Sequence, residues 1–549
     1  MKQTTFLLLC FFGLHLSAQD VAWFKKTESN GNFTSHNFHA SLYHDGHYYW
    51  SGSFWRDIFF DDLHLSMPVS MDLQNGFLLK TDTDGNAVSL WHLESDNYLR
   101  VTDMAINPAN GNLTVTGFFR QDITFNDLTL ESTFGNEGFL MEINANGNVN
   151  WVLRAEPSDE FSSAGGSALG IDSQGNIYAA FSTFGSIAVG DVQISGGQEN
   201  IGTLIVKTDQ NGEMTASQHW IGTDFESFVD VTHIEVLSDD RIAFGGDFNQ
   251  DFSYADEVTE AGGAGVYAFL IAENADLEPL WGESYTGAAV NLNDMLTDDG
   301  KLLVSFAYNN NISINETEIF GTGTWRETAV ALFDADGQTE WVKNFTLTQF
   351  SGNNSISGVG LTKTQNRYWV GGLYQDWAEH EGEIILTGQN PEGSDFQMPF
   401  LMALDKQGNL QTAIDFIGSQ GPSLIQTITS DGNSPTFGGE FATSVRLGGT
   451  TLQTVNSTLF YGQLAEVTDI APTPAAPCDI AVRVSAAESK IYITGDAYES
   501  AEIYDAAGRK TNVVLQENTE MIDVRGLAHG VYFLRLQCEN CTRTFPIIR

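Results

Sequence analysis

The chain has 549 residues and is strongly acidic, with 71 Asp and Glu against 25 Lys and Arg, a formal net charge of −46 and a pI near 4.2. This charge excludes nucleic acid and anionic membrane surfaces as partners, because both are bound through Lys and Arg. Hydrophobic residues make up 42% of the chain and aromatic residues 12%, so it can still bury a large core.

The first residues, 1–19, are typical of a secretory signal peptide. Lys2 is followed by a short apolar run over residues 6–14, and Ser17-Ala18 supplies the small residues expected near a cleavage site. This run is too short to span a bilayer, and no later stretch approaches the required length. Cys10 lies inside the apolar run, which disfavours a lipid-anchored cysteine. We therefore expect an exported protein without a transmembrane segment.

A repeat of about 64 residues follows the signal peptide. Six tryptophans recur 60 to 69 residues apart, and most of them follow a turn rich in Asp, Asn and Gly. The six are Trp23, Trp91, Trp151, Trp220, Trp281 and Trp341. In the next repeat Ile414 takes the place of Trp, and the turn near Asn274 has lost its Gly.

A second, independent series has the pattern Gly-x-aromatic, and it ends strands that follow a tight turn. Its members begin at Gly52, Gly117, Gly246, Gly372 and Gly439. We place the two missing members at Phe306-x-Tyr308 and, in weaker form, at Ala180-x-Ser182. Each repeat is thus predicted to be four antiparallel strands, with a variable loop between the second and third.

Seven such units without a helical period favour an all-β fold, a seven-bladed β-propeller over residues 20–467. The last unit has only three strands before the chain reaches a Pro-rich segment, while Val21–Lys26 looks like an isolated fourth strand. Inserting it into the last blade would pair two open edges. The repeats resemble degenerate bacterial propellers of the SBBP type. The alternative architecture is a β-helix or an array of β-sandwiches.

Two turns contain alternating carboxylates followed by Gly, as at the start of a calcium loop. These calcium candidates are Asp82, Asp84, Asp334 and Asp336. No Glu stands at the twelfth loop position, which excludes an EF-hand, and other repeats carry Asn or Gln in the same turn. We expect the carboxylates to serve the turn, with calcium as the alternative and no other cofactor.

Four of the 11 histidines lie in one predicted hairpin around the turn Asp45-Gly46, with His36, His39 and His44 before the turn and His47 after it. Histidine is a frequent metal ligand, but alternation along a strand sends His36 and His39 to opposite faces. Surface histidines beside a turn are therefore favoured over a metal site. One turn also resembles the Asp-box of sialidase-like propellers, and the Trp pattern resembles quinoprotein propellers. Arginines for the former are scarce, and cofactor contacts for the latter cannot be located.

The C-terminal segment begins after a Pro/Ala linker at residues 468–477. Residues 503–509 read IYDAAGR, residues 522–536 read IDVRGLAHGVYFLRL, and the chain ends in Arg549. This pattern resembles the type A C-terminal sorting domain of the type IX (Por) secretion system of Bacteroidetes. The motif positions are Tyr504, Gly508, Leu527, Gly530, Tyr532 and Leu534. The resemblance implies a small β-sandwich over residues 478–549 that a translocon recognises and a sortase removes.

The cysteines outside the signal peptide are Cys478, Cys538 and Cys541, all within the last 72 residues. Cys538 and Cys541 form a CxxC at the tip of a predicted hairpin, so a structural role is favoured over a redox or metal site. The pairing of the three cysteines is open.

No nucleophile, phosphate-cradling loop or catalytic carboxylate pair stands out in the sequence. We therefore expect a secreted or cell-surface propeller that binds a glycan, protein or matrix component without catalysis. The alternative is a secreted polysaccharide-degrading enzyme with carboxylates in the central pocket of the propeller, since the geometry of such a pair is not visible in a sequence.

Overall fold

The computed structural model describes most of the chain from Val21 onward, and its elements are all β-strands. The described residues are 21–29, 36–67, 74–132, 134–195, 200–222, 224–254, 257–259, 265–315, 317–321, 326–347, 355–375, 378–381, 383–386, 397–418, 423–465, 480–485, 490–495, 500–505, 510–511, 521–527, 531–537 and 542–548. They fall into two compact units, one within Leu16–Glu466 and the other within Val467–Arg549. No helix among them could span a membrane. The predicted signal peptide and linker lie outside the described residues.

The larger unit repeats one antiparallel sheet of four strands. Its first strands are β2 (His36–His44), β8 (Tyr98–Ile106), β14 (Ser163–Ile171), β20 (Val229–Val236), β26 (Gly287–Asp298), β31 (Ser355–Lys363) and β38 (Ser423–Ser430). The second strands are β3 (His47–Phe54), β9 (Leu113–Arg120), β15 (Ile177–Phe184), β21 (Ile242–Phe248), β27 (Lys301–Ile314), β32 (Arg367–Gln375) and β39 (Pro435–Phe441).

The third strands are β6 (Asn75–Asp82), β12 (Asn136–Ile143), β18 (Ile201–Thr208), β24 (Tyr267–Glu273), β29 (Glu327–Phe333), β35 (Met398–Asp405) and β42 (Thr458–Leu464). The fourth strands are β7 (Ala87–Ser95), β13 (Val149–Pro157), β19 (Met214–Gly222), β25 (Pro279–Tyr285), β30 (Thr339–Leu347), β36 (Leu410–Asp415) and, for the last sheet, β1 (Val21–Lys26).

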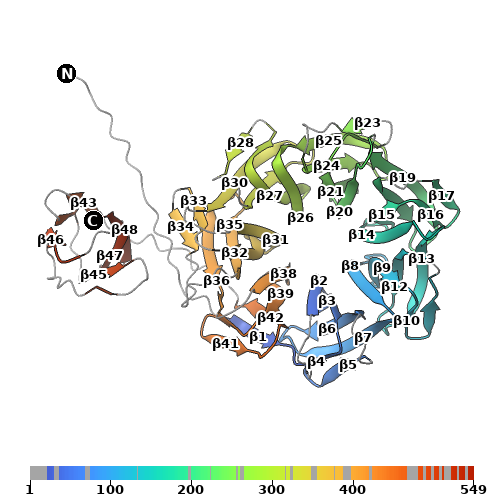
Figure 1. Cartoon of the computed structure of the whole chain (residues 1–549), viewed down its shortest axis with the longest axis horizontal. Coiled ribbons are helices and arrows are strands. Elements are labelled where there is room, and N and C mark those ends of the chain that lie inside the picture. Colours follow the sequence, from blue (N-terminus) through green and yellow to red (C-terminus); the bar gives the residue numbers. More distant parts are fainter. Residues whose placement is uncertain are drawn as a thin grey trace. The chain divides into compact units, whose positions relative to one another are not determined.

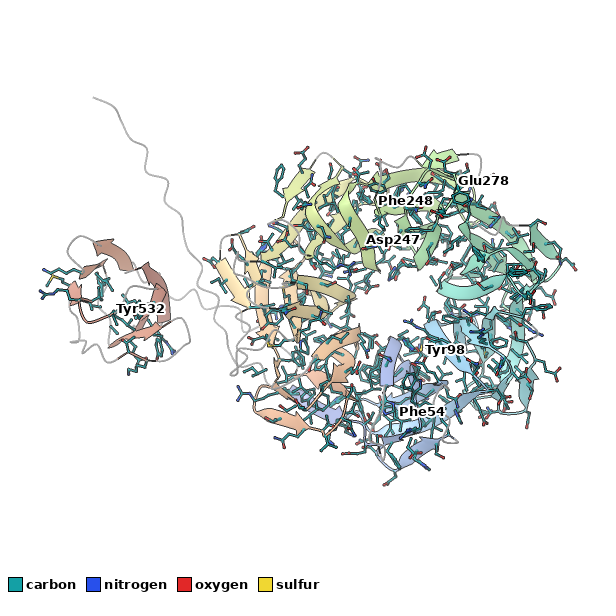
Figure 2. All side chains as sticks on the ribbon, in the orientation of Figure 1. Phe54, Tyr98, Asp247, Phe248, Glu278 and Tyr532 are labelled. Atoms are coloured by element: carbon teal, nitrogen blue, oxygen red, sulfur yellow. The ribbon has the colours of Figure 1, made fainter. Side chains whose placement is uncertain are left out.

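The sheets stand around a central axis as the blades of a β-propeller, with each first strand innermost (Figure 1). The core lies between neighbouring sheets. One cluster, for example, joins Tyr178 of β15 to Phe244 of β21 and Phe269 of β24. Figure 2 shows Asp247 on the inner side of the ring and Glu278 on its outer side. The chain thus places polar side chains at both the inner and outer margins and apolar ones between sheets.

The N-terminal strand closes the ring. β1 pairs antiparallel with β42, with Val21 opposite Leu464 and Lys26 opposite Phe460. The backbone pairing continues as Thr27 N donates to Leu459 O at 3.0 Å. The predicted insertion of Val21–Lys26 into the last sheet is confirmed, and it covers the edge of β42 that would otherwise be open.

The predicted variable loop between second and third strands contains a short hairpin in most repeats. The hairpins are β4 (Asp57–Phe60) with β5 (Leu63–Ser66), β10 (Ile123–Phe125) with β11 (Leu128–Leu130), β16 (Ser186–Val189) with β17 (Val192–Ser195), β22 (Phe252–Tyr254) with β23 (Glu257–Thr259), β33 (Ala378–His380) with β34 (Glu383–Leu386), and β40 (Ser444–Leu447) with β41 (Thr450–Gln453). In the remaining repeat β28 (Thr317–Phe320) pairs with the long β27.

These hairpins reach the sheet that precedes them in the chain. β10 pairs with β7, β16 with β13, β22 with β19 and β33 with β30, while β40 pairs with β37 (Ile417–Gly418), which follows β36. Each of them therefore covers part of the outer edge of a neighbouring blade, where unpaired backbone groups would otherwise invite aggregation.

The glycines of the second series lie opposite a phenylalanine on the third strand. The cross-strand pairs are Gly52–Phe77, Gly117–Phe139, Gly246–Phe269, Gly372–Phe400 and Gly439–Phe460. A Cβ on any of these glycines would lie 2.0 to 2.3 Å from a carbonyl oxygen of the first strand. The pattern therefore reflects a close backbone approach that only glycine permits without rearrangement.

In two sheets a phenylalanine takes the place of the second-strand glycine. Phe306 pairs with Ala329, and Phe181 pairs with Leu204, so the second strand supplies the ring. The predicted equivalence of Phe306 is confirmed. The placement at Ala180-x-Ser182 is wrong by one residue, because Phe181 takes the glycine position opposite Gly166. Neither aromatic residue nor glycine marks positions 180 and 182, so the weak motif gave no register.

The tryptophans bind the turn of the following sheet. Trp23 Nε1 donates to Thr83 O at 2.9 Å, and Trp281 Nε1 donates to Ala335 O at 3.1 Å. A Cβ on the turn glycine Gly85 or Gly337 would meet the respective indole within 3 Å. Trp220 differs: its ring is fully buried among Phe244, Phe252, Tyr254 and Phe269, and the following turn has Leu277 with φ 61° instead of glycine.

The smaller unit contains two three-stranded sheets. One is β43 (Ile480–Ser485), β44 (Lys490–Gly495) and β46 (Met521–Asp523), and the other is β45 (Ser500–Asp505), β47 (Val531–Gln537) and β48 (Thr542–Ile548). A single buried cluster joins residues of both sheets, including Ile491, Ile503, Leu534 and Leu536.

Candidate functional site

Each innermost strand contains a β-bulge at the same point of the repeat. The bulged residues are His39, Thr102, Ser167, Thr232, Asn293, Val359 and Gln426. Several of them bind the next sheet: Thr102 Oγ1 donates to Gly166 O, Ser167 Oγ to Val231 O and Asn293 Nδ2 to Gly358 O, each at 2.7 Å. The bulges therefore aim side chains across the sheet junctions and around the central axis.

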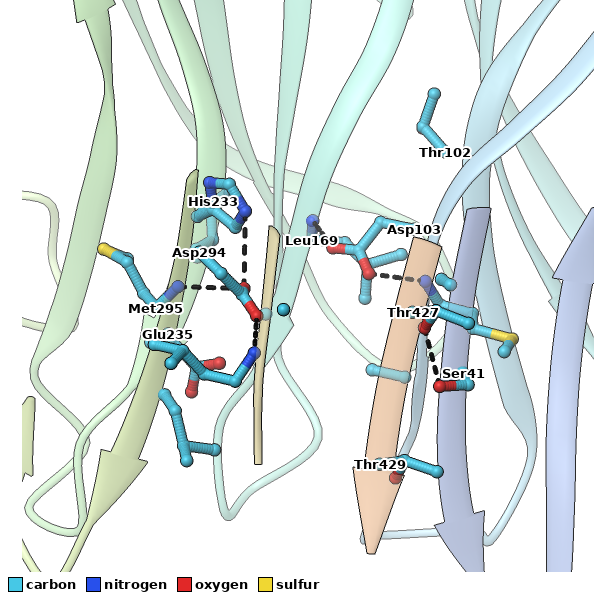
Figure 3. Close-up of a pocket in the computed structure, with 18 of the residues that line it drawn as sticks. Ser41, Thr102, Asp103, Leu169, His233, Glu235, Asp294, Met295, Thr427 and Thr429 are labelled. Atoms are coloured by element: carbon cyan, nitrogen blue, oxygen red, sulfur yellow. Dashed lines mark hydrogen bonds and ion pairs between the residues drawn. The ribbon is translucent and has the colours of Figure 1, made fainter. Parts of the chain in front are cut away.

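The innermost strands enclose a central cavity of about 460 Å³. Its lining includes three carboxylic acids, Asp103, Glu235 and Asp294, together with His39 and His233. The remaining lining side chains are aliphatic residues, Met, Ser, Thr and Gln, and the lining as described contains no Lys or Arg. Figure 3 shows Asp294 and Asp103 projecting from different strands of this cavity. The volume is within the range of small-molecule sites.

Asp103 and Asp294 bind backbone amides of the following sheet. Asp103 accepts hydrogen bonds from Leu169 N at 2.9 Å and from Met104 N at 2.7 Å. Asp294 accepts them from Leu361 N at 2.5 Å and from Met295 N at 2.9 Å (Figure 3). These carboxyl groups are thus positioned by the backbone and link one blade to the next.

Burial dominates the ionisation of both groups. It raises the pKa of Asp103 to about 6, although the two amide hydrogen bonds oppose the shift. Burial also raises the pKa of Asp294 well above its usual range, and the nearby charges of Glu235 and Asp103 raise it further. The cavity therefore holds carboxyl groups that take up protons near neutral pH.

Glu235 lies two residues after His233 on the same strand and has fewer partners. Its carboxylate accepts a hydrogen bond from Thr297 Oγ1 at 3.1 Å. Burial raises the pKa of Glu235 to about 7, with the nearby Asp103 charge adding to the shift. His233 Nε2 lies 3.4 Å from Asp294 Oδ1, and burial lowers the pKa of His233 to about 4, so the imidazole is neutral at pH 7.

The arrangement favours neutral or cationic ligands. Carboxyl groups, a neutral imidazole and hydroxyl groups supply donors and acceptors, while an anion would meet acids without a compensating cation on the wall. Carboxyl groups with unequal environments in one cavity can also divide the roles of proton donor and acceptor. The site is thus compatible with binding and with acid–base chemistry.

The four calcium candidates lie in two turns between third and fourth strands. In the first turn, Asp82 Oδ1 accepts hydrogen bonds from Asp84 N at 3.0 Å and from Asn86 N at 2.8 Å. In the second turn, Asp334 Oδ1 accepts hydrogen bonds from Asp336 N at 3.0 Å and from Gln338 N at 2.8 Å. Asn144 and Asn274 make the same bonds in their turns. Among the described residues, no three or more His, Cys, Asp and Glu side chains are grouped to hold a metal. Calcium at these turns stays a prediction.

Two of the four clustered histidines are not at the surface. His36 is fully buried, and burial lowers its pKa to about 4. His39 lines the central cavity, with Nε2 2.9 Å from Ser53 Oγ. The prediction of surface histidines is therefore wrong for this pair, because the first strand of a propeller blade is the one buried against the axis.

The predicted sorting motif contributes to the core of the smaller unit. Leu527, Tyr532 and Leu534 belong to its buried cluster, and Tyr504 Oη donates to Glu502 Oε2 at 2.5 Å. Gly508 and Gly530 lie outside the described residues, as do Cys478, Cys538 and Cys541, whose pairing stays open.

The acids of the cavity were missed in the sequence. A signal exists: polar pairs stand at the same point of three first strands, Thr102-Asp103, Thr232-His233 and Asn293-Asp294, two repeats apart for the first two and one repeat apart for the last two. Recognising it requires the register of the innermost strand, since the same residues would face solvent in a strand shifted by one position.

Comparison with known proteins identifies the C-terminal segment. Residues 485–548 match the family model of the "Secretion system C-terminal sorting domain". This domain indicates handling by the type IX secretion system and secretion to the cell surface or extracellular space. No curated protein matches the chain.

Several solved structures are similar at low identity. A protein of unknown function from Bacteroides caccae is 12% identical, with a TM-score of 0.30. The match covers 62% of this chain and 89% of the Bacteroides caccae chain. A protein of unknown function from Dyadobacter fermentans DSM 18053 is 9% identical, with a TM-score of 0.35. The match covers 82% of this chain and 100% of the Dyadobacter chain. The extracellular domain of a putative one-component system from B. thetaiotaomicron is 12% identical, with a TM-score of 0.17. The match covers 93% of this chain and 86% of that domain's chain.

Proposed function

We propose that this secreted protein is a seven-bladed β-propeller that binds a neutral or cationic ligand in its central cavity without transforming it. The single observation that carries the proposal is the cavity itself: about 460 Å³, lined by all the innermost strands, with Asp103, Glu235 and Asp294 on its wall and no Lys or Arg in the described lining. Each four-stranded sheet of the larger unit supplies one blade.

We assign residues 1–19 to a signal peptide, 20–467 to the propeller, 468–477 to a linker and 478–549 to the sorting domain. The two sheets of the smaller unit would pack as a β-sandwich around their shared core. As in type A sorting domains, the outer-membrane translocon would recognise this domain and a sortase would remove it. The propeller would then be displayed on the surface or released.

The binding proposal is tested by filling the cavity. Ala105 lines the cavity and lies three residues after the bulged Thr102. Glu235 has the same place in its own strand, three residues after the bulged Thr232. Ala105→Trp should weaken binding of any ligand found on arrays of neutral glycans and of amines at least tenfold, with an unchanged melting temperature. Ala216→Ser, on the fourth strand β19, is the matched control. Full binding by the Ala105→Trp variant would overturn the cavity as the binding site.

A second candidate is a polysaccharide-degrading enzyme, and the environment of Glu235 is the observation that favours it. A carboxyl with a pKa of about 7 beside other carboxyl groups can act as a general acid at neutral pH. Reducing-sugar release by the wild-type chain, lost at least 100-fold in Glu235→Gln with binding retained, would establish it. No release from any polysaccharide that the protein binds would eliminate it.

A further inference from the structure

Two matching pairs of exposed apolar side chains lie at successive junctions between blades. Phe134 precedes β12 and Phe161 lies between β13 and β14, while Ile201 begins β18 and Phe225 lies between β19 and β20. Their exposed fractions are 38% and 60% in the first pair and 41% and 61% in the second. Phe161 and Phe225 are 64 residues apart, one repeat.

Backbone contacts hold each pair together. In the first pair, a Cβ on Gly135 would lie only 2.3 Å from Ser162 O, so the segments next to Phe134 and Phe161 touch. In the second, Ile201 N donates to Ser227 O at 3.0 Å. Both connections join a fourth strand to the next first strand, so both pairs lie at the same end of the sheets.

Hydrogen bonds fix the loops that carry Phe161 and Phe225, the more exposed member of each pair. Asp159 Oδ1 accepts hydrogen bonds from Phe161 N at 3.0 Å and from Ser162 Oγ at 2.7 Å. Around Phe225, Gln250 Nε2 donates to Phe225 O at 3.3 Å and Asn249 Nδ2 donates to Glu226 O at 3.1 Å. The rings are therefore displayed on ordered backbone, which lowers the entropy lost on binding.

The chemistry beside the rings is acidic. Glu160 precedes Phe161, and Asp224 and Glu226 flank Phe225, all three exposed. An aromatic ring packs against the C–H face of a pyranose, and adjacent carboxylates accept hydrogen bonds from its hydroxyl groups. The same carboxylates repel phosphate, sulfate and uronate groups. A protein partner would need one contiguous apolar patch, whereas each pair here is confined to one junction.

We propose that these two junctions form a platform for an extended neutral polysaccharide, with one pair contacting sugar rings at each junction. A ligand that repeats along its length matches a surface that repeats from blade to blade. The platform rests on the proposed binding function but lies apart from the central cavity, so the two can fail separately.

Affinity electrophoresis of the full chain tests the platform, with the neutral polymers laminarin, mannan and xylan, the anionic polymer alginate, and polylysine in separate gels. At least one neutral polymer should retard the wild type, and Phe161→Ala/Phe225→Ala should weaken that binding at least tenfold. Val88→Ala/Leu280→Ala removes side chains of 48% and 47% exposure from fourth strands and should change nothing.

The outcomes separate the two sites. Binding weakened by Ala105→Trp and not by the double phenylalanine variant would overturn the platform and leave the cavity proposal intact. Retardation by polylysine or alginate alone, or by no polymer, would also overturn the platform. Equal circular dichroism melting curves for all variants show that lost binding does not reflect unfolding.

Discussion

At the scale of single residues, the recurring glycines of the second strand are set by packing. Gly117 lies between the carbonyl oxygen of Arg100 and the ring of Phe139, and a Cβ there would be 2.1 Å from the former and 2.9 Å from the latter. The ring of the third-strand phenylalanine thus occupies the space that a side chain on the second-strand glycine would need. Where the second strand carries Phe306 instead of glycine, the third-strand residue opposite it is the small Ala329.

We expect Gly117→Ala to destabilise the propeller by about 1–3 kcal/mol, the usual effect of overpacking, because a backbone oxygen cannot rotate away. Urea unfolding of the variant measures the difference. Gly449→Ala is the matched control, since a Cβ on Gly449 would have no heavy atom within 4 Å. Equal losses in both variants would contradict the packing explanation.

Glu273 is a fully buried carboxyl at a third-strand position that is Ile143 or Phe333 in other sheets. Burial raises its pKa to about 8 from an ordinary value of 4.5. Between these values the folded chain holds a proton that the unfolded chain has released. This group therefore makes stability rise as pH falls from 8 toward 4.5.

Glu273→Gln should stabilise the protein at pH 8 by on the order of 4–5 kcal/mol, since the pKa of Glu273 rises from 4.5 to about 8 and one pKa unit corresponds to about 1.4 kcal/mol. The difference from the wild type should shrink toward zero near pH 4.5. Urea unfolding of both proteins at pH 8 and pH 5 provides the measurement, because the other acids titrate equally in the two. A difference that is the same at both pH values would refute the assignment.

At the scale of elements, stability depends on contacts between blades. Most short hairpins pair with the preceding fourth strand, Trp indoles bind the next turn, and Asp103 and Asp294 bind the next innermost strand. The ring closes in the same way, since β1 completes the sheet of β42 and its Trp23 contacts the turn of the first sheet. One short N-terminal strand therefore connects both ends of the propeller.

Deleting Val21–Thr27 from the mature chain should lower the melting temperature and promote aggregation, because β42 then presents an open edge. Differential scanning calorimetry and light scattering follow the two effects. A synthetic peptide of residues 21–28 should restore the melting temperature in part, whereas a Trp23→Ala peptide should restore less. Unchanged melting after the deletion would contradict closure by β1.

At the scale of the whole molecule, charge is divided unevenly. From Cys478 onward the chain has ten Asp and Glu and eight Lys and Arg, a net of −2, so nearly all of the −46 belongs to the preceding residues. The exported propeller is thus strongly acidic and well solvated, while the domain that the secretion machinery handles is almost neutral.

Removing residues 478–549 should abolish delivery to the cell surface, because the sorting domain is the address that the secretion system reads. The truncated protein should accumulate inside the outer membrane, as measured by surface labelling and fractionation. Fusing residues 468–549 to a periplasmic reporter tests the converse. Surface delivery of the truncated chain would show that another segment carries the signal.

Sequence periodicity by itself determined the repeated four-stranded unit, the N-terminal closing strand and the sorting domain. Each depends on local turn chemistry, strand alternation or a contiguous motif, which are properties of neighbouring residues. The register of Phe181, the burial of His36 and the hairpins that join blades were decided only by the tertiary structure, since each depends on contacts across a sheet or between sheets.

The candidate sites, too, were decided only by the tertiary structure. Asp103, Glu235 and Asp294 stand in three different repeats, and nothing in their own strands distinguishes them from solvent-facing acids. Only the closed ring brings them to one cavity and removes enough water to shift their ionisation. Phe161 and Phe225 stand one repeat apart in the sequence, but their exposure and their pairing with Phe134 and Ile201 depend on the tertiary structure. The sequence determined the unit and its destination, and the ring determined which side chains share a site.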